Sequence, residues 1–358
     1  DVERSRGLGD VYKRQINNLC FIMFRIVFHK VFIIHDKLCR QGLFYFNVYG
    51  TGTISIIYED YYKYDKYQKG DLRMYTGNYE CLELFVKPDE GKKGSVLLKN
   101  VKESTTETKE LKHIYGNWIK FPVSRNTEYE ISTQDCTITF AYLSECENIM
   151  ENGICVLDTT DNYKEMNKEE FLRFIDTPYR EQYHFSPVVN WNNDPNGLCW
   201  FKGYYHLFYQ LNPFGQEWNN MYWGHAASKD LMHWTHLPVA LEPQEEILDN
   251  LAIKGGAFSG SALPMGDEVY FYLTRHIGPQ DDGWDTVQYQ TMTKSSDMIH
   301  FEPEKEIIRE KPEGTNYDFR DPKAIKIGKK YYIVLGACID EKLSLIHISE
   351  PTRPLYIS

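Results

Sequence analysis

The sequence predicts an all-β protein, in which part of a β-propeller follows a β-sandwich-like domain. The first observation is composition: 15% of the 358 residues are aromatic and 27 are tyrosine, a residue type enriched in strands. The second is an internal repeat in which a turn glycine precedes a run of aromatic and β-branched residues. Its three copies, 63 and 62 residues apart, are GYYHLFY from Gly203, GDEVYFY from Gly266 and GKKYYIV from Gly328. Repeats of this length built from short strands are typical of four-stranded propeller blades, with a generic β-sandwich as the alternative.

A second series of motifs supports the repeat. Residues 228–234 and 295–301 both read S-x-D-apolar-apolar-H-aromatic, at an offset of 67 residues. Just before each turn glycine lies a polar pair: Asp194-Pro195, Ser259-Gly260 and Asp321-Pro322. Equivalent positions of successive blades form a ring about the propeller axis, so the repeat predicts that Asp194, Ser259 and Asp321 converge. By itself the stretch WNNDPNG at 191–197 would be a good β-turn and nothing more.

Charge and composition exclude several function classes. The formal net charge is −11 and no basic stripe occurs, which argues against a nucleic-acid partner. The most apolar run, residues 19–34, contains Arg25, His29 and Lys30, so we expect no membrane span there. The eight cysteines form no CxxC pair, and nothing indicates a metal or an organic cofactor. Their scatter slightly favours a cytoplasmic over a secreted protein.

Both ends of the chain read as foreign sequence. Residues 5–15, SRGLGDVYKRQ, and 343–353, LSLIHISEPTR, resemble in-frame translations of the transposase adapter used to prepare sequencing libraries. Segments of this kind are excluded from fold reasoning. We therefore expect residues 1–15 and 343–358 to be non-native, and the native N-terminus to be missing.

Four motifs follow one another between Tyr183 and Asp340: YHFSPVVNWNNDPNG, LFYQLNPFGQEWNNMYWGHAASKDLMHW, FSGS at 258–261 and FRDP at 319–322. This region, under half of the chain, resembles glycoside hydrolase family 32, the β-fructosidases, with Asn192 where Met is commoner. The family includes invertases, levanases, inulinases and sucrose-6-phosphate hydrolases. Its fold is a five-bladed β-propeller followed by a β-sandwich. The resemblance implies that residues 183–342 form about two and a half blades of such a propeller.

The resemblance also implies roles for individual residues. Asp194 would be the nucleophile of a retaining reaction, and Asp321 would stabilise the transition state. Retaining glycosidases pair the nucleophile with a protonated carboxyl group about 5–5.5 Å away. In the family that acid is a glutamate in a Glu-Cys motif about one blade beyond the RDP motif, and no such glutamate follows Asp321 here. Glu80-Cys81 and Glu145-Cys146 precede the nucleophile motif and read as ordinary β-domain residues, so this fragment is expected to be inactive. The implied substrate-binding residues are Trp191, Asn193, Gln210, Trp218, Phe258, Ser259 and Arg320.

Residues 16–158 have no counterpart in the catalytic core of that family. Candidate strands at 53–58, 79–86, 94–98 and 137–142, separated by turns rich in Gly, Asp, Asn and Lys, predict an antiparallel β-sandwich. Such a domain could bind fructan chains through exposed aromatic side chains, but a structural or oligomerisation role is slightly favoured. Residues 159–182 would form a linker, with a short capped helix at 167–174.

The sequence thus predicts a hydrolase that cleaves terminal β-D-fructofuranosyl bonds of sucrose, fructo-oligosaccharides or fructans. Its partner would be a small-molecule or oligosaccharide fructoside, with no nucleic acid and no membrane. Two alternatives stay open. A fructosyltransferase would use the same site with a sugar acceptor in place of water, and a fructan-binding protein would bind without catalysis.

Overall fold

The computed structural model describes residues 72–159, 184–279, 286–339 and 342–349, the short stretches 45–48 and 54–57, and residues 166, 170, 171, 176 and 180. The chain divides into two units, residues 1–68 and 69–358. In the first unit, β1 (Tyr45–Val48) and β2 (Ile54–Ile57) pair as an antiparallel hairpin. The apolar run at 19–34 and most of the helix predicted at 167–174 lie outside the described residues.

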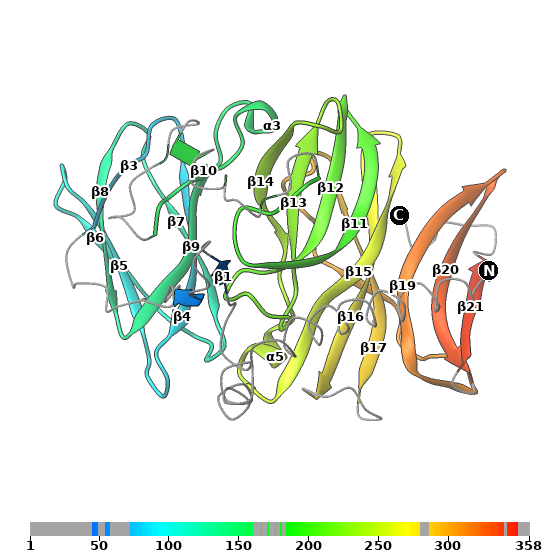
Figure 1. The fold of residues 1–358 in the computed structure, drawn as a ribbon. Helices are drawn as coiled ribbons and strands as arrows, with labels where there is room; N and C mark the ends of the chain where they lie inside the picture. Colours follow the sequence, from blue (N-terminus) through cyan, green and yellow to red (C-terminus); the bar gives the residue numbers. More distant parts are fainter. Residues whose placement is uncertain are drawn as a thin grey trace, which may run out of the picture. The chain divides into compact units, whose positions relative to one another are not determined.

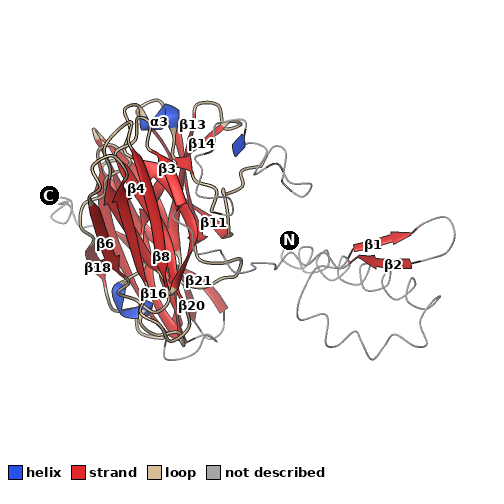
Figure 2. Ribbon diagram, turned by 90° about the vertical axis from the view of Figure 1, so that its left-hand side faces the viewer, coloured by secondary structure: helices blue, strands red, loops and turns tan. Residues whose placement is uncertain are grey.

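The second unit confirms the all-β prediction. Its described helical residues are the single turns α3 (Ile149–Asn152) and α5 (Glu245–Leu248) and the pair 170–171, which lies within the helix predicted at 167–174; strands make up the remaining regular structure (Figure 2). Within the described ranges no helix is long and apolar enough to cross a membrane.

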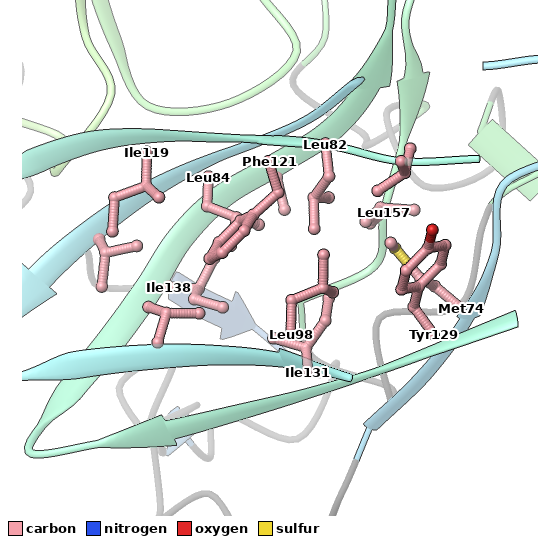
Figure 3. Close-up of a cluster of buried hydrophobic side chains, with 14 of the residues drawn as sticks. Met74, Leu82, Leu84, Leu98, Ile119, Phe121, Tyr129, Ile131, Ile138 and Leu157 are labelled. Atoms are coloured by element: carbon pink, nitrogen blue, oxygen red, sulfur yellow. The ribbon is translucent and has the colours of Figure 1, made fainter. Parts of the chain in front are cut away.

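The first part of this unit is a sandwich of two four-stranded antiparallel sheets (Figure 1). One sheet has the order β10 (Cys155–Val156), β9 (Cys136–Ser144), β4 (Cys81–Pro88) and β7 (Asn117–Pro122). The other has the order β3 (Leu72–Tyr75), β8 (Glu128–Gln134), β5 (Ser95–Asn100) and β6 (Thr106–Glu110). Side chains such as Leu82, Leu84, Phe121 and Ile131 fill the space between the sheets (Figure 3). Alternation of buried and half-exposed residues along β5 gives it the period of two that a half-buried strand requires.

The second part consists of three consecutive up-and-down sheets, which agree with two complete blades and three strands of a third (Figure 1). The first blade contains β11 (Trp191–Phe201), β12 (Tyr204–Asn212), β13 (Tyr222–Ser228) and β14 (Trp234–Leu241). The second contains β15 (Ile253–Met265), β16 (Glu268–Pro279), β17 (Val287–Ser295) and β18 (Lys305–Ile308). The third contains β19 (Thr315–Ile327), β20 (Lys330–Ile339) and β21 (Lys342–Ser349).

The repeated S-x-D-x-x-H motif forms the turn that leaves the third strand of a blade. Ser228 Oγ accepts a hydrogen bond from the Leu231 amide at 2.8 Å, and Asp230 Oδ1 accepts one from the His233 amide at 2.8 Å. His233 Nδ1 also lies 2.7 Å from Asp230 Oδ2. The second copy makes the same bonds through Ser295, Asp297 and His300. These polar residues therefore serve the turn rather than a ligand.

The sandwich packs against the first blade through an aromatic cluster that includes Phe85, Phe140, Tyr142, Phe214 and Tyr222. A buried carboxylate, Glu83, lies beside this cluster and is 2% exposed. It accepts hydrogen bonds from Trp118 Nε1 at 2.8 Å and from the Tyr142 hydroxyl at 2.9 Å. The same hydroxyl accepts a bond from the backbone amide of Val239 in β14 at 3.1 Å. Polar and aromatic contacts together thus join the sandwich to the blade.

The strand β21 includes residues predicted to be foreign. Its backbone pairs with β20 in an antiparallel register, with Ile348 opposite Ile333 and Leu345 opposite Gly336. A hydrogen-bonded backbone pairing is open to many sequences, so the foreign origin of residues 343–358 stays a prediction. The DNA flanking both ends of the gene would test it.

Candidate active site

The innermost strands of the three blades lie next to one another in the order β11, β15, β19. Each has an irregular register at the motif that the repeat singles out. The shifts fall between Asn192 and Pro195 in β11, between Ala257 and Gly260 in β15, and between Arg320 and Lys323 in β19. A bulge of this kind leaves a residue unpaired and changes the direction of its side chain. The repeat therefore places a bulge, rather than an ordinary turn, at each functional motif.

The first two bulges bring Asp194 and Ser259 into contact. Ser259 Oγ donates a hydrogen bond to Asp194 Oδ2 at 2.7 Å, although the two residues are 65 positions apart. Asp194 is exposed, and its second carboxylate oxygen has no hydrogen bond to a described residue in the structure. Beside it, Trp191 Nε1 donates to Asn193 Oδ1 at 2.9 Å. Ser259 thus orients the Asp194 carboxylate through Oδ2, and Oδ1 is available to attack a substrate.

The third bulge carries Asp321 in an unusual backbone conformation. Its φ angle is 62°, a region that residues other than glycine rarely adopt and that recurs at functional sites. Desolvation by the surrounding strands raises the pKa of Asp321; Arg320 opposes this shift, and the negative charge of Asp194 adds to it. The side chain stays 55% exposed, which limits the effect of desolvation. The charge of Asp194 on β11 thus acts on Asp321 on β19 across the intervening strand β15.

Arg320 lies between the carboxylates of Asp318 and Asp321. Its Nε is 3.9 Å from Asp321 Oδ2, and its Nη1 donates to Asp318 Oδ1. Sequence reasoning missed Asp318, which stands directly before the FRDP motif. The ion pair with Asp318 fixes the guanidinium beside Asp321. A long side chain with a planar donor group needs such a second partner to keep one orientation.

Aromatic rings line the side of the second bulge. Phe258 stacks face to face on His276, with 4.1 Å between ring centroids, and Trp218 meets Phe258 edge-on at 6.1 Å. Burial lowers the pKa of His276 to about 4, so that its imidazole is neutral at neutral pH. Lys254 Nζ lies 5.5 Å from the Trp218 ring. His276 and Lys254 are further residues that the motifs alone did not indicate.

Gln210 lies beneath the site rather than at its surface. It is 2% exposed, and its Nε2 donates to the backbone oxygen of Ala257 at 2.7 Å. Asn196, which is 1% exposed, lies beside it. The side-chain amide of Asn196 is oriented so that both its oxygen and its nitrogen form hydrogen bonds. In this orientation Asn196 Oδ1 accepts from Gln210 Nε2 at 3.0 Å, and the amide nitrogen donates to Ser259 Oγ at 3.3 Å. The substrate contact of Gln210 stays a prediction. Asn196 was interpreted from the sequence only as a turn residue, but it is buried and holds the hydroxyl of Ser259.

The side chains so assembled define a class of site. Two aspartates on the bulges of the first and third blades, a hydroxyl from the second blade that orients one of them, an arginine and a wall of aromatic rings suit the attack of a carboxylate on a sugar. No three His, Cys, Asp or Glu side chains in the described part of the chain are placed to hold a metal ion. The fold is that of part of a β-propeller, and these side chains are of the types that a glycoside hydrolase requires.

Comparison with known proteins agrees with this class. Residues 184–350 match the glycosyl hydrolases family 32 N-terminal domain, so this part of the chain is similar to that family. Sucrose-6-phosphate hydrolase of Zymomonas mobilis is 37% identical over 180 residues, covering 50% of this chain and 34% of its own length. Levanase of Bacillus subtilis is 41% identical over 172 residues, covering 46% of this chain and 24% of its own length.

Among solved structures, a family 32 glycoside hydrolase from Bifidobacterium adolescentis superposes with a TM-score of 0.69 at 32% identity. The superposition covers 75% of this chain and 46% of that one. Residues 184–350 alone cannot supply three quarters of the chain, so the similarity extends into the region before the propeller. The chain spans about a third or less of the length of the two curated relatives.

Proposed function

We propose that this chain carries the nucleophile and the transition-state stabiliser of a retaining β-fructofuranosidase, with Asp194 and Asp321 in these roles. The observation that carries the proposal is the placement of both aspartates on bulges of the innermost strands, on either side of β15, where Ser259 binds Asp194 and the charge of Asp194 acts on Asp321. The match of residues 184–350 to family 32 supports it. The bond cleaved would be a terminal β-D-fructofuranosyl bond. Sucrose, fructo-oligosaccharides and fructans all contain it.

In the proposed reaction the free oxygen of Asp194 attacks the anomeric carbon of fructose. The bond to the leaving group breaks, and its electron pair departs with the leaving-group oxygen, which takes up a proton from solvent water. Water then attacks the fructosyl-enzyme, releases fructose and restores the carboxylate. Ser259 keeps the nucleophile in line by binding its other oxygen. Asp321 accepts hydrogen bonds from fructose hydroxyls, where they strengthen in the transition state.

The aromatic residues and Arg320 would hold the sugar. Trp218 and Phe258 offer apolar faces against which the carbon face of a furanose ring packs, and His276 supports Phe258 from behind. The names of the relatives cover phosphorylated sucrose and levan, so the proposal is made for the fructofuranosyl bond and not for one substrate. A sugar acceptor in place of water would make the same intermediate a fructosyltransferase.

A donor whose leaving group needs no proton tests the nucleophile without a general acid. We expect the full chain to release fluoride from β-D-fructofuranosyl fluoride, and mass spectrometry of the intact protein to detect the fructosyl adduct. Asp194→Asn removes the nucleophile and should reduce release to background. Asp267→Asn, at an exposed turn aspartate of the second blade, is the matched control and should release fluoride like the wild type.

No release by the wild type, or equal release by Asp194→Asn, would contradict the proposal. With sucrose we expect a rate about 10²–10⁴-fold below that of acid-assisted hydrolysis, because the proposal assigns no proton donor among the described residues. Analysis of the products separates the two enzyme classes. Fructose alone indicates hydrolysis, and longer oligosaccharides indicate transfer.

A further inference from the structure

We propose that Thr274 and Gln290, on the second and third strands of the second blade, are positioning residues that fix Asp321 for fructosyl transfer. The inference rests on the function proposed above, because it concerns the residue that would stabilise the transition state. Both side chains are completely buried, at 0% exposure, so neither can touch a substrate. They act through the backbone around Asp321.

A short chain of hydrogen bonds connects the pair to the bulge of the next blade. Thr274 Oγ1 donates to Gln290 Oε1 at 2.7 Å and accepts from the backbone amide of Asp321 at 3.1 Å. Gln290 Nε2 donates to the backbone oxygen of Phe319 at 2.8 Å. Each bond fixes the orientation of the next, since a hydroxyl that donates to an amide oxygen presents its lone pair to the Asp321 amide.

Neighbouring side chains complete the support. Gln288 Oε1 accepts from the backbone amide of Phe319 at 2.7 Å, and Gln288 Nε2 lies 3.1 Å from His276 Nδ1. On the other side of the bulge, Ser261 Oγ donates to the backbone oxygen of Pro322 at 2.7 Å. The backbone is thus held on both sides of Asp321 by the second blade. These bonds keep a residue with a φ of 62° in place, and so determine where its carboxylate points.

The same arrangement occurs one blade earlier, which is independent support. Gln210 and Trp223 face each other across β12 and β13, as Thr274 and Gln290 do across β16 and β17. Gln210 Nε2 and Trp223 Nε1 both donate to the backbone oxygen of Ala257, at 2.7 and 3.1 Å. Ala257 stands two residues before Ser259, as Phe319 stands two before Asp321. A polar cross-strand pair in one blade thus holds the bulge of the next.

The test replaces the hydroxyl without changing the volume. Thr274→Val removes the hydrogen bonds, and Thr274→Ser keeps them. Thr293→Val is the control: Thr293 lies in the same sheet, is 2% exposed, and its hydroxyl donates to the backbone oxygen of Glu302. We expect Thr274→Val to lower kcat for fluoride release by about 10²-fold, since misplacement by about 1 Å can cost that much. Thr274→Ser should restore the wild-type rate.

Thermal unfolding and carboxyl NMR separate positioning from stability. We expect Thr274→Val and Thr293→Val to lower the melting temperature alike, but only the former to lower the rate. In carbon-13 titrations, the pKa of Asp321 should fall in Thr274→Val, since a relaxed bulge is better solvated, and stay unchanged in Thr293→Val. If Thr274→Val does not fold, Gln290→Met, which removes the amide at similar volume, should give the same pattern.

The outcomes distinguish this inference from the proposed function. A wild-type rate in Thr274→Val, or an equal loss in Thr293→Val, would overturn the inference and leave the proposed function intact. If the wild type transfers no fructosyl group, the proposed function fails. The NMR titration then decides the positioning role alone, and an unchanged Asp321 pKa in Thr274→Val overturns it.

Discussion

The sandwich and the propeller blades use buried polar side chains for different ends. In the sandwich, Glu83 collects donors from its own sheet, and the Tyr142 hydroxyl continues the contact to Val239 of the first blade. In the blades, Thr274 and Gln290 reach the bulged strand of the next blade. Both regions are antiparallel β-structure, so the strands themselves do not make the difference. The difference lies in the backbone that the buried polar groups bind: in the sandwich it belongs to a packing contact, and in the blades it carries a site residue.

The largest expected effect on stability comes from removing the sandwich's buried carboxylate. Glu83→Ala leaves the donors of Trp118, Tyr142 and Ser144 unsatisfied, and we expect it to lower the free energy of unfolding by about 3–5 kcal/mol. Urea denaturation measures this change. The rate of fluoride release per folded molecule should not change, because Glu83 touches no residue of the site.

The control for this variant is Glu80→Ala. The Glu80 side chain is 51% exposed and pairs with Arg125 at 3.1 Å, so its loss should cost about 0–1 kcal/mol. Equal stability of the two variants would contradict the role of Glu83. A lower rate of fluoride release by folded Glu83→Ala would show that the buried polar group of the sandwich also acts on the site.

A smaller effect is expected at the contact between the sandwich and the first blade. A Cβ added at Gly116 would lie 2.6 Å from the ring of Phe214, so Gly116→Ala should cost about 1–3 kcal/mol through overpacking. Gly215→Ala is the control, since its Cβ would meet only the Asn212 amide at 3.8 Å. Thermal unfolding of both variants tests the contact. Wild-type stability of Gly116→Ala would show that the two parts are not packed together in solution.

The smallest expected effect is a shift in the titration of Asp321. The charge of Asp194 raises the pKa of Asp321 and that of Arg320 lowers it, so Asp194→Asn should lower this pKa and Arg320→Gln should raise it. Carbon-13 NMR of labelled aspartate measures both. Ionised Asp321 accepts hydrogen bonds through both oxygens, and protonation weakens them and turns one oxygen into a donor. Because the pKa of Asp321 is raised, wild-type activity should fall with decreasing pH, beginning above the range of an ordinary aspartate. Shifts in the opposite directions would show that the two aspartates are not electrostatically coupled.

Much of the site could be predicted from the sequence because the repeat is regular. The phase of Asp194, Ser259 and Asp321 relative to the turn glycines indicated that they converge, and the structure brings Asp194 and Ser259 to 2.7 Å. The positions of the strands at 79–86, 94–98 and 137–142 also followed from local pattern. Local pattern gave no sign of Thr274 or Gln290, which look like ordinary β-strand residues. Their role depends on partners 29 and 47 residues away along the chain.

Strand periodicity and turn residues are local properties of the chain, so they were enough to predict the all-β fold and the blade repeat and to single out Asp194 and Asp321 as site candidates. The packed sheets were needed to see that the WNNDPNG stretch is a bulge in β11 rather than a free turn, and that Gln210 lies under the site. The packing also decided which hydroxyls and amides hold each bulge. The physical reason is that a buried hydrogen bond needs a partner from another blade, and that partner is fixed only when the sheets pack together.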